Sequence, residues 1–282
     1  NPGPPARAGC KIAQFMTDKS HKLHHWVGLA VFFLTLGVYV KTMAPTVSFW
    51  DCGEFIATAY TMSIPHPPGA PLYVLIGRVF TLFPFGEVAA RINFMSALSS
   101  ALAIWCVYLT TAALGRRALG GQSLKAFGDH RDIGVIAGAA VAALTLAFSY
   151  TQWYNASEAE VYGYSILFTC LGLWLIVYWD GTGHGQENDR WLFAIAYLFG
   201  LGGGLHMLCL LTIPSLLILA WFSDSRLQRL IVQLLGLGII GFVAMLVLGP
   251  GIPSNAVMGL GLLGLLYYLY GQDRRLFYLL LG

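Results

Sequence analysis

Long apolar runs separated by short polar breaks fill most of the chain. A helix needs about 20 mostly apolar residues to cross a bilayer. The runs lack the alternating pattern of a membrane barrel strand, and a helix satisfies its own backbone hydrogen bonds in lipid. We therefore predict an all-α polytopic membrane protein with about eight transmembrane helices, over residues 26–43, 92–114, 133–150, 162–179, 191–204, 206–222, 230–249 and 255–271.

Two shorter apolar stretches lie between the first two predicted spans. Residues 51–63 and 71–83 favour helix but are too short to cross a membrane, and the proline-rich stretch 64–71 separates them. We expect both helices to lie along the outer membrane interface, within a first outer loop over 44–91.

Composition supports the membrane assignment. Hydrophobic residues make up 57% of the 282 residues and charged residues only 10%, and the mean hydropathy is +0.68. The net charge of +3 is not concentrated in any tract, so nucleic-acid binding is not expected. The cysteines have neither a zinc-binding spacing nor a disulfide framework.

The distribution of basic residues predicts the orientation. If the N-terminus is cytoplasmic, every Lys and Arg except Lys41, Arg78 and Arg91 falls on the cytoplasmic side, as the positive-inside rule requires. Residues 1–25 then form a basic cytoplasmic segment and 26–282 a transmembrane domain, in a bacterial inner membrane or an ER membrane. The chain has no initiator Met and stops within an apolar run, so we expect it to be part of a longer gene product.

Two carboxylates follow the first predicted span. Asp51 and Glu54 are three residues apart and share one face of a helix that starts near Trp50. One interpretation is helix capping, by Ser48 or Asp51, with Glu54 completing a capping box. The other is chemical, because the apolar neighbours hold this segment at the membrane interface, where a lipid-linked substrate can reach a carboxylate.

The rest of the first outer loop adds a histidine, two arginines and an amide. His66 precedes Pro67, so its backbone should be extended and stiff, which either fixes a functional side chain or only connects two helices. Arg78 lies on the second short helix, and Arg91 and Asn93 lie at the outer mouth of the second span. Snorkelling toward the headgroups is the alternative to a functional role for both arginines.

Further polar residues are predicted on the same side of the membrane. Glu158 and Glu160 precede the fourth span, where complementation of the helix dipole is the alternative to a functional role. His206 follows a tight turn at residues 202–204, which should place it near the outer surface beside the 51–91 region.

Several of these segments together resemble a known family, the transmembrane protein O-mannosyltransferases that modify plexin-type ectodomains, with their bacterial relatives. The resemblance covers roughly residues 26–222. It rests on the motifs PTV (45–47), WDCGEF (50–55), HPPGAPLY (66–73), RINFMSAL (91–98), EAEVY (158–162) and GLH (204–206).

The resemblance implies a multi-pass glycosyltransferase of the C-type (GT-C) fold. Such enzymes move a sugar from a polyprenyl-phosphate carrier to an acceptor outside the cytoplasm, using an acidic residue in the first outer loop. Asp51 matches that residue and is the candidate base for a Ser or Thr hydroxyl, in an inverting displacement that transfers mannose. The implied partners are the lipid-linked donor, an extracytoplasmic protein or glycan acceptor, and membrane lipids.

The same resemblance gives roles to the other polar residues. Preorganised cations offset the charge on the departing phosphate, whereas carboxylates orient the sugar or the acceptor, or hold a divalent cation, which is the weaker interpretation. We expect no metal or other cofactor. The candidate catalytic residues are Asp51 and Glu54, and the candidate substrate-binding residues are His66, Arg78, Arg91, Asn93, Glu158, Glu160 and His206.

Two functions from other classes remain open. The chain could be a non-catalytic transmembrane subunit of a larger membrane complex built on a glycosyltransferase-like scaffold. It could also be a transporter, although transporters place polar groups near the membrane midplane, and the charges here collect at the outer rim.

Overall fold

The computed structural model describes residues 8–119, 130–182, 188–224 and 227, and these residues form an all-helical structure. The predicted spans over 230–249 and 255–271 lie outside them. The helices are α1 (Ala8–Thr42), α2 (Cys52–Thr61), α3 (Pro71–Thr81), α4 (Val88–Ala118), α5 (His130–Ala147), α6 (Tyr150–Ala156), α7 (Tyr162–Thr182), α8 (Arg190–Gly202), the 3-10 helix η1 (Met207–Thr212) and α9 (Ile213–Ser223).

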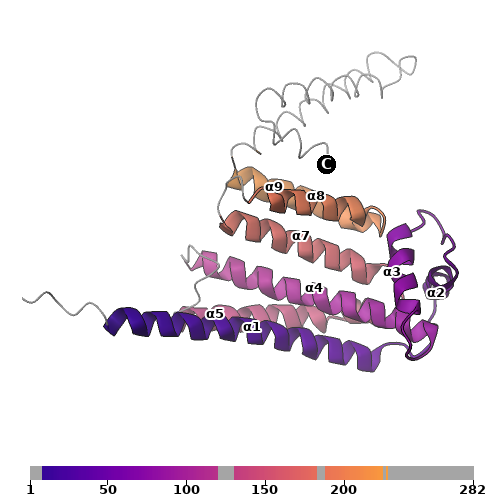
Figure 1. Ribbon diagram of the computed structural model, residues 1–282, viewed down its shortest axis with the longest axis horizontal. Helices are drawn as coiled ribbons and strands as arrows, with labels where there is room; N and C mark the ends of the chain where they lie inside the picture. Colours follow the sequence, from indigo (N-terminus) through magenta and orange to yellow (C-terminus); the bar gives the residue numbers. More distant parts are fainter. Residues whose placement is uncertain (1–7, 120–129, 183–187, 225–226, 228–282) are drawn as a thin grey trace, which may run out of the picture.

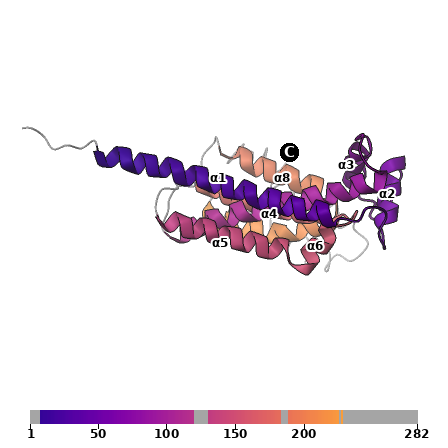
Figure 2. The ribbon, with the colours of Figure 1, turned by 90° about the horizontal axis from the view of Figure 1, so that it is seen from below.

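The long helices lie side by side as a bundle, and two short helices close one of its ends. Helices α1, α4, α5, α7, α8 and α9 run along a common axis, whereas α2 and α3 lie beyond the bundle at one end (Figure 1). The view turned by 90° shows the same arrangement (Figure 2). The helices predicted at 51–63 and 71–83 are therefore present, and they lie where an outer loop would cover the bundle.

Helix α4 is the centre of the bundle, packing against α1, α5 and α7. Its small side chains allow close approach, as is typical of membrane helices. Ala97, Ala101 and Ala103 are fully buried. On the facing helix, a Cβ at Gly163 would lie 2.9 Å from Ser99 Oγ, so α7 meets α4 here through a residue without a side chain.

Large apolar side chains face outward from the bundle. Trp26 and Phe33 on α1 and Phe222 on α9 are all more than half exposed. Helices that are apolar on their outer faces as well as inside are suited to lipid rather than water. The chain is a membrane protein.

The prediction of eight membrane spans is wrong for the described residues, which include six of the predicted spans but only three or four helical segments that could cross. Three helical segments are long and apolar enough to cross, Lys22–Thr42, Val88–Ala118 and Tyr162–Thr182, and α5 with α6 makes a fourth only if this pair, bent by 67°, is one span. Helix α8 has 13 residues, or about 20 Å at 1.5 Å per residue, which is shorter than a hydrocarbon core of about 30 Å.

The sixth expected span is also shorter than a crossing helix. Its apolar run divides into η1 and α9, which together reach only from Met207 to Ser223. Helix α9 has Pro214 in its first turn, where a missing backbone N–H is tolerated. Apolar composition alone did not reveal that this run is divided between two kinds of helix.

Candidate functional site

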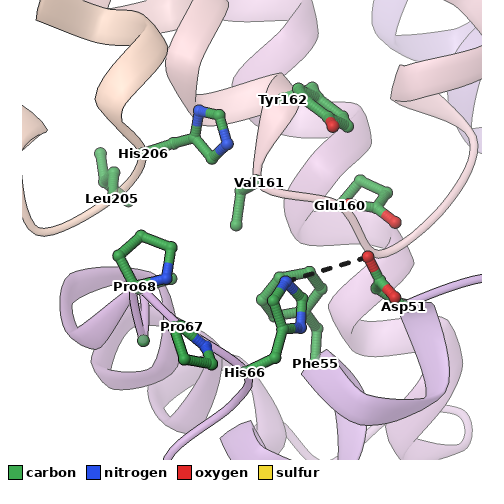
Figure 3. A pocket seen from close by; sticks show the side chains of 12 residues that line it. Asp51, Phe55, His66, Pro67, Pro68, Glu160, Val161, Tyr162, Leu205 and His206 are labelled. Atoms are coloured by element: carbon green, nitrogen blue, oxygen red, sulfur yellow. Dashed lines mark ion pairs between the residues drawn. The ribbon is translucent and has the colours of Figure 1, made fainter.

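A cavity of about 150 Å³ lies at the end of the bundle that α2 and α3 close (Figure 3). Four segments that are distant in sequence form its wall: the start of α2, the proline-rich loop after α2, the bend before α7 and the turn before η1. The lining residues are Asp51, Phe55, His66, Pro67, Pro68, Gly69, Ala70, Glu160, Val161, Tyr162, Leu205 and His206.

The backbone before α2 is held so that Asp51 reaches this cavity. The side chain of Asn93, fully buried on α4, donates from Nδ2 to the carbonyl oxygens of Ala44 (2.7 Å) and Thr46 (3.0 Å). Trp50 then has a φ of 63°, a left-handed conformation that is rare for a bulky residue and that turns the chain into α2. Asn93 therefore supports the site from behind and does not line the cavity.

Asp51 occupies the N-cap position of α2, but its side chain makes no capping hydrogen bond. The carboxylate is 56% exposed, and its Oδ2 lies 4.0 Å from Nε2 of His66 (Figure 3). The capping interpretation of the sequence thus does not describe this side chain. The carboxylate is free to meet a molecule in the cavity.

Glu54 is committed to His66. Its Oε1 accepts a hydrogen bond from the backbone N–H of His66 at 2.7 Å. Its Oε2 lies 2.7 Å from Nδ1 of the same residue. No capping box forms, because both oxygens face the loop. The hydrogen bonds from His66 lower the pKa of Glu54, and the bond to Glu54 raises the pKa of His66.

The proline-rich loop carries His66 back over α2. Gly69 has a φ of 97°, which favours glycine, and the loop closes with a hydrogen bond from its backbone N–H to the carbonyl oxygen of His66 (2.9 Å). The imidazole contacts the ring of Phe55, with 5.7 Å between centroids. The loop therefore positions a side chain and does more than connect two helices.

Glu160 is the buried acid of the cavity. It is 7% exposed and lies near Asp51 and Glu158, and the Cys52 thiol donates to its Oε1 at 3.8 Å. Burial, followed by the charges of Asp51 and Glu158, raises the pKa of Glu160 to about 7. Glu158 is equally buried but lies beside Tyr154 and does not line the cavity.

His206 lies on the same side as residues 51–91, as the turn at 202–204 predicts. Its Nδ1 accepts the backbone N–H of Leu208 at 3.2 Å and so caps η1, and its ring meets that of Tyr162 with 5.5 Å between centroids. Burial lowers its pKa. The Leu72 N–H donates to the carbonyl oxygen of Gly204 (2.8 Å), which ties this turn to α3.

Both arginines of the outer loop bind backbone carbonyls outside the cavity lining. Arg78 donates to the carbonyl oxygen of Tyr60 (2.7 Å) at the end of α2. Arg91 donates to the carbonyl oxygens of Thr81 (2.7 Å), Gly86 (2.7 Å) and Phe85 (2.6 Å). Each guanidinium thus holds a helix end or a turn in place.

The structure therefore brings some of the predicted site residues together and leaves others apart. Asp51, His66, Glu160 and His206 line one cavity, and Glu54 supports His66 from outside the lining. The remaining candidates, Arg78, Arg91, Asn93 and Glu158, do not line it. Catalytic and binding roles for all nine residues stay predictions.

Sequence reasoning missed the apolar and aromatic part of the lining. Phe55, Tyr162 and Leu205 contribute to the wall. The sequence offered one sign of this, because each of them lies beside a polar candidate within the motifs that carried the resemblance. An apolar side chain in an apolar chain gives no signal of its own.

One group of side chains could in principle hold a cation. Among the residues that the structure describes, this group consists of Asp51, Glu54 and His66. Each offers one ligand atom, and these atoms lie within 4.8 Å of one another. A cation would have to compete with the two hydrogen bonds that already join Glu54 to His66. A metal-free site therefore stays the prediction.

Comparisons with known proteins bear on this site. The profile of the family described as "Protein O-mannosyl-transferase TMEM260 N-terminal domain" matches residues 51–229, a stretch that begins at Asp51 and contains His206. The Protein O-mannosyl-transferase TMEM260 of Mus musculus is 30% identical over 174 residues, which cover 61% of this chain and 22% of that protein. No solved structure matches.

A second relative agrees with the first. The Protein O-mannosyl-transferase tmem260 of Dictyostelium discoideum is 29% identical over 191 residues, covering 63% of this chain and 21% of the relative. The chain thus spans about a fifth of the length of these two relatives. The resemblance seen in the sequence is confirmed: the chain belongs to the TMEM260 family of protein O-mannosyltransferases and corresponds to its N-terminal domain.

Proposed function

We propose that the protein transfers mannose from a polyprenyl-phosphate carrier to a Ser or Thr hydroxyl of an extracytoplasmic protein, in the cavity that contains Asp51. The observation that carries this proposal is that the Asp51 carboxylate lines the cavity and makes no helix-capping hydrogen bond. Asp51 is also the first residue of the stretch that matches the family.

The proposed reaction is a single displacement at the anomeric carbon. The acceptor oxygen forms a bond to that carbon while the bond from the carbon to the phosphate oxygen breaks, and the electron pair leaves with the phosphate. Asp51 takes the hydroxyl proton, a step in which a positioned base contributes about 10²–10⁴-fold in rate. Attack opposite the leaving group inverts the anomeric configuration, by analogy with inverting glycosidases. No step requires a cofactor.

The surroundings of Asp51 suit a donor dissolved in the membrane. Phe49 and Trp50 directly precede Asp51 and are 87% and 85% exposed, and exposed aromatic side chains are typical of the membrane interface. A polyprenyl chain can stay in the bilayer while its sugar enters the cavity, and the acceptor can approach from water. We place this end of the bundle outside the cytoplasm, in a bacterial inner membrane or an ER membrane.

Transfer of labelled mannose tests the proposal. Membranes that contain the protein are supplied with labelled polyprenyl-phosphate mannose and a Ser/Thr-containing acceptor, and the Asp51→Asn variant is compared with Glu87→Gln. Glu87 is an exposed acid at the start of α4 that does not line the cavity. We expect Asp51→Asn to lower the rate at least about 10²-fold and Glu87→Gln to leave it unchanged. Full activity of Asp51→Asn would remove Asp51 from the role of base.

A further inference from the structure

The two histidines of the cavity are held through the same ring nitrogen but in opposite senses. His206 Nδ1 accepts a hydrogen bond from the backbone N–H of Leu208 at 3.2 Å. A backbone N–H can only donate, so Nδ1 of His206 carries no proton. In the neutral ring the proton is therefore on Nε2, which can donate to another molecule.

His66 has the opposite arrangement. Its Nδ1 lies 2.7 Å from Oε2 of Glu54, and the same carboxylate accepts the His66 backbone N–H. An ionised carboxylate can only accept, so Nδ1 carries the proton and Nε2 of the neutral ring has a free lone pair. That lone pair lies on the side of Asp51, whose Oδ2 is 4.0 Å away. When the His66 ring is neutral, its Nε2 and the Asp51 carboxylate are both proton acceptors on this side of the cavity, and when the ring is protonated Nε2 pairs with Asp51.

Charge divides the cavity in the same way. Asp51 and Glu160 lie on one side of it, and His206 and Leu205 on the other (Figure 3). The Arg78 and Arg91 guanidinium groups bind backbone carbonyls away from the cavity. Among the described residues that line it, only the histidines have nitrogen in their side chains. A phosphate is repelled by the acidic side and finds a donor on the other.

We propose that His206 donates a hydrogen bond from Nε2 to a phosphate oxygen of the lipid carrier, so that the leaving group lies at the His206 side and the acceptor hydroxyl at the side of His66 and Asp51. This inference rests on the proposed function and gives the site its direction. The phosphate gains negative charge as the anomeric bond breaks, and a donor already fixed in place stabilises that charge without reorganisation. The backbone N–H of Leu208 holds the His206 ring in place and keeps its proton on Nε2.

Two variants separate this role from the capping of η1. In His206→Asn the side-chain oxygen can replace Nδ1 as the acceptor for Leu208, but nothing replaces the Nε2 donor. In His206→Gln the amide group can reach the Nε2 position and donate, whereas the capping acceptor is lost. A donor to phosphate predicts that Asn impairs the enzyme and Gln retains it. A cap alone predicts the reverse order.

Two readouts are measured for each variant in lipid nanodiscs: mannose transfer, and binding of polyprenyl phosphate without a sugar. For His206→Asn we expect about a 10- to 100-fold weaker affinity for polyprenyl phosphate and a similar rise in the donor KM, with the KM for the acceptor unchanged. His206→Gln should stay within about threefold of the unmodified protein in both readouts. The inference would be overturned if His206→Asn bound polyprenyl phosphate as tightly as the unmodified protein, or if both variants lost affinity equally. A rise in the acceptor KM of His206→Asn would also overturn it.

The two readouts also separate this inference from the proposed function. Asp51→Asn should bind polyprenyl phosphate at least as tightly as the unmodified protein and fail only in transfer. If the unmodified protein binds polyprenyl phosphate, with the expected difference between the Asn and Gln variants, but never transfers mannose, the proposed function fails and the phosphate site stands. If the unmodified protein does not bind polyprenyl phosphate at all, the inference is wrong.

Discussion

At the scale of single residues, Glu54 fixes the side chain of His66 at the cavity. The two hydrogen bonds between them fix the imidazole, set its tautomer and leave Nε2 beside Asp51. Asp51 itself is free of any helix-capping bond. The neighbour of the candidate base, His66, is therefore positioned by Glu54, which does not line the cavity.

Removing the charge of Glu54 should lower the pKa of His66. The hydrogen bond to Glu54 is the main cause that raises this pKa above its usual value of 6.5, and Glu54→Gln removes the charge while keeping the shape. The pKa can be measured from the His66 ring signals in an NMR titration. Glu87→Gln is the control and should leave the pKa in place. An unchanged pKa in Glu54→Gln would contradict the pairing.

Glu160 should make stability depend on pH. Its folded-state pKa of about 7 lies above the ordinary value of 4.5, so its contribution is complete below pH 4.5 and is lost as the pH rises through 7. Relative to Glu160→Gln, the unmodified protein should lose on the order of 3 kcal/mol of unfolding free energy across that window.

The neighbours of Glu160, namely Asp51, Glu158, Cys52 and His66, are present in both proteins, so the comparison isolates Glu160. The measurement is the midpoint of thermal unfolding in detergent between pH 4.5 and pH 8. A difference between the two proteins that does not change with pH would show that Glu160 is not buried as a shifted acid.

The sequence predicted which polar residues lie together better than it predicted their hydrogen-bond partners. Asp51, His66, Glu160 and His206 were all candidates and share one cavity. Arg78 and Arg91 donate hydrogen bonds to backbone carbonyl oxygens at the end of α2 and in the turn at 81–86. The positions of these segments in space cannot be read from the sequence. The pairing of Glu54 with His66 depends in the same way on a loop that folds back over α2.

At the scale of elements, the packing of α2 against α3 fixes the two ends of the loop that carries His66. A Cβ at Gly77 would lie 2.8 Å from the Cβ of Ala59, so the two helices touch through a glycine and an alanine. Neither side can yield by rotating a flexible side chain. Helix α2 begins beside Asp51, and the loop between the helices carries His66, so their separation matters for the site.

Gly77→Ala should therefore reduce both stability and transfer. We expect a loss of about 1–3 kcal/mol from overpacking, together with lower activity because Asp51 and His66 move apart. Gly138→Ala on α5 is the matched control, since nothing lies within 4 Å of a Cβ there, and it should be neutral or gain about 0.5–1 kcal/mol. Thermal unfolding and mannose transfer are the measurements. Equal behaviour of the two variants would contradict close packing of α2 on α3.

The sequence also predicted the kinds of element better than their lengths. The short helices in the outer loop and the long helices α1, α4 and α7 were expected and are present. What apolar composition could not reveal is where a run is interrupted, as in the bend of 67° between α5 and α6. Backbone geometry and packing at the breaks set these lengths.

At the scale of the whole molecule, the two ends of the bundle are chemically different. The end away from α2 and α3 carries ion pairs that neutralise basic residues, with Arg117 Nη1 at 2.7 Å from Asp180 Oδ2 and Arg116 Nε at 3.6 Å from Asp132 Oδ1. The other end carries the acidic cavity. We propose that the end with the arginines faces the cytoplasm and that the end with the cavity lies outside it.

Labelling of an introduced cysteine tests this orientation, because Cys52, Cys106, Cys170 and Cys209 are buried. Met62→Cys follows α2 at the cavity end, and Leu119→Cys follows α4 at the opposite end, and both positions are exposed. Cys10 is replaced by Ser in both proteins. In intact cells or sealed ER vesicles, a membrane-impermeant maleimide should reach these positions from opposite sides, with Met62→Cys on the extracytoplasmic side. Labelling of Leu119→Cys from that side would reverse the proposed topology.

A structure of the protein in a lipid nanodisc, with a polyprenyl-phosphate mannose analogue that cannot transfer its sugar, would show where the donor binds. We expect the sugar in the cavity, the phosphate on the side of His206, and room for an acceptor oxygen at hydrogen-bonding distance, about 2.6–3.2 Å, from the Asp51 carboxylate. A sugar bound elsewhere, with the cavity between Asp51 and His206 left empty, would contradict this expectation.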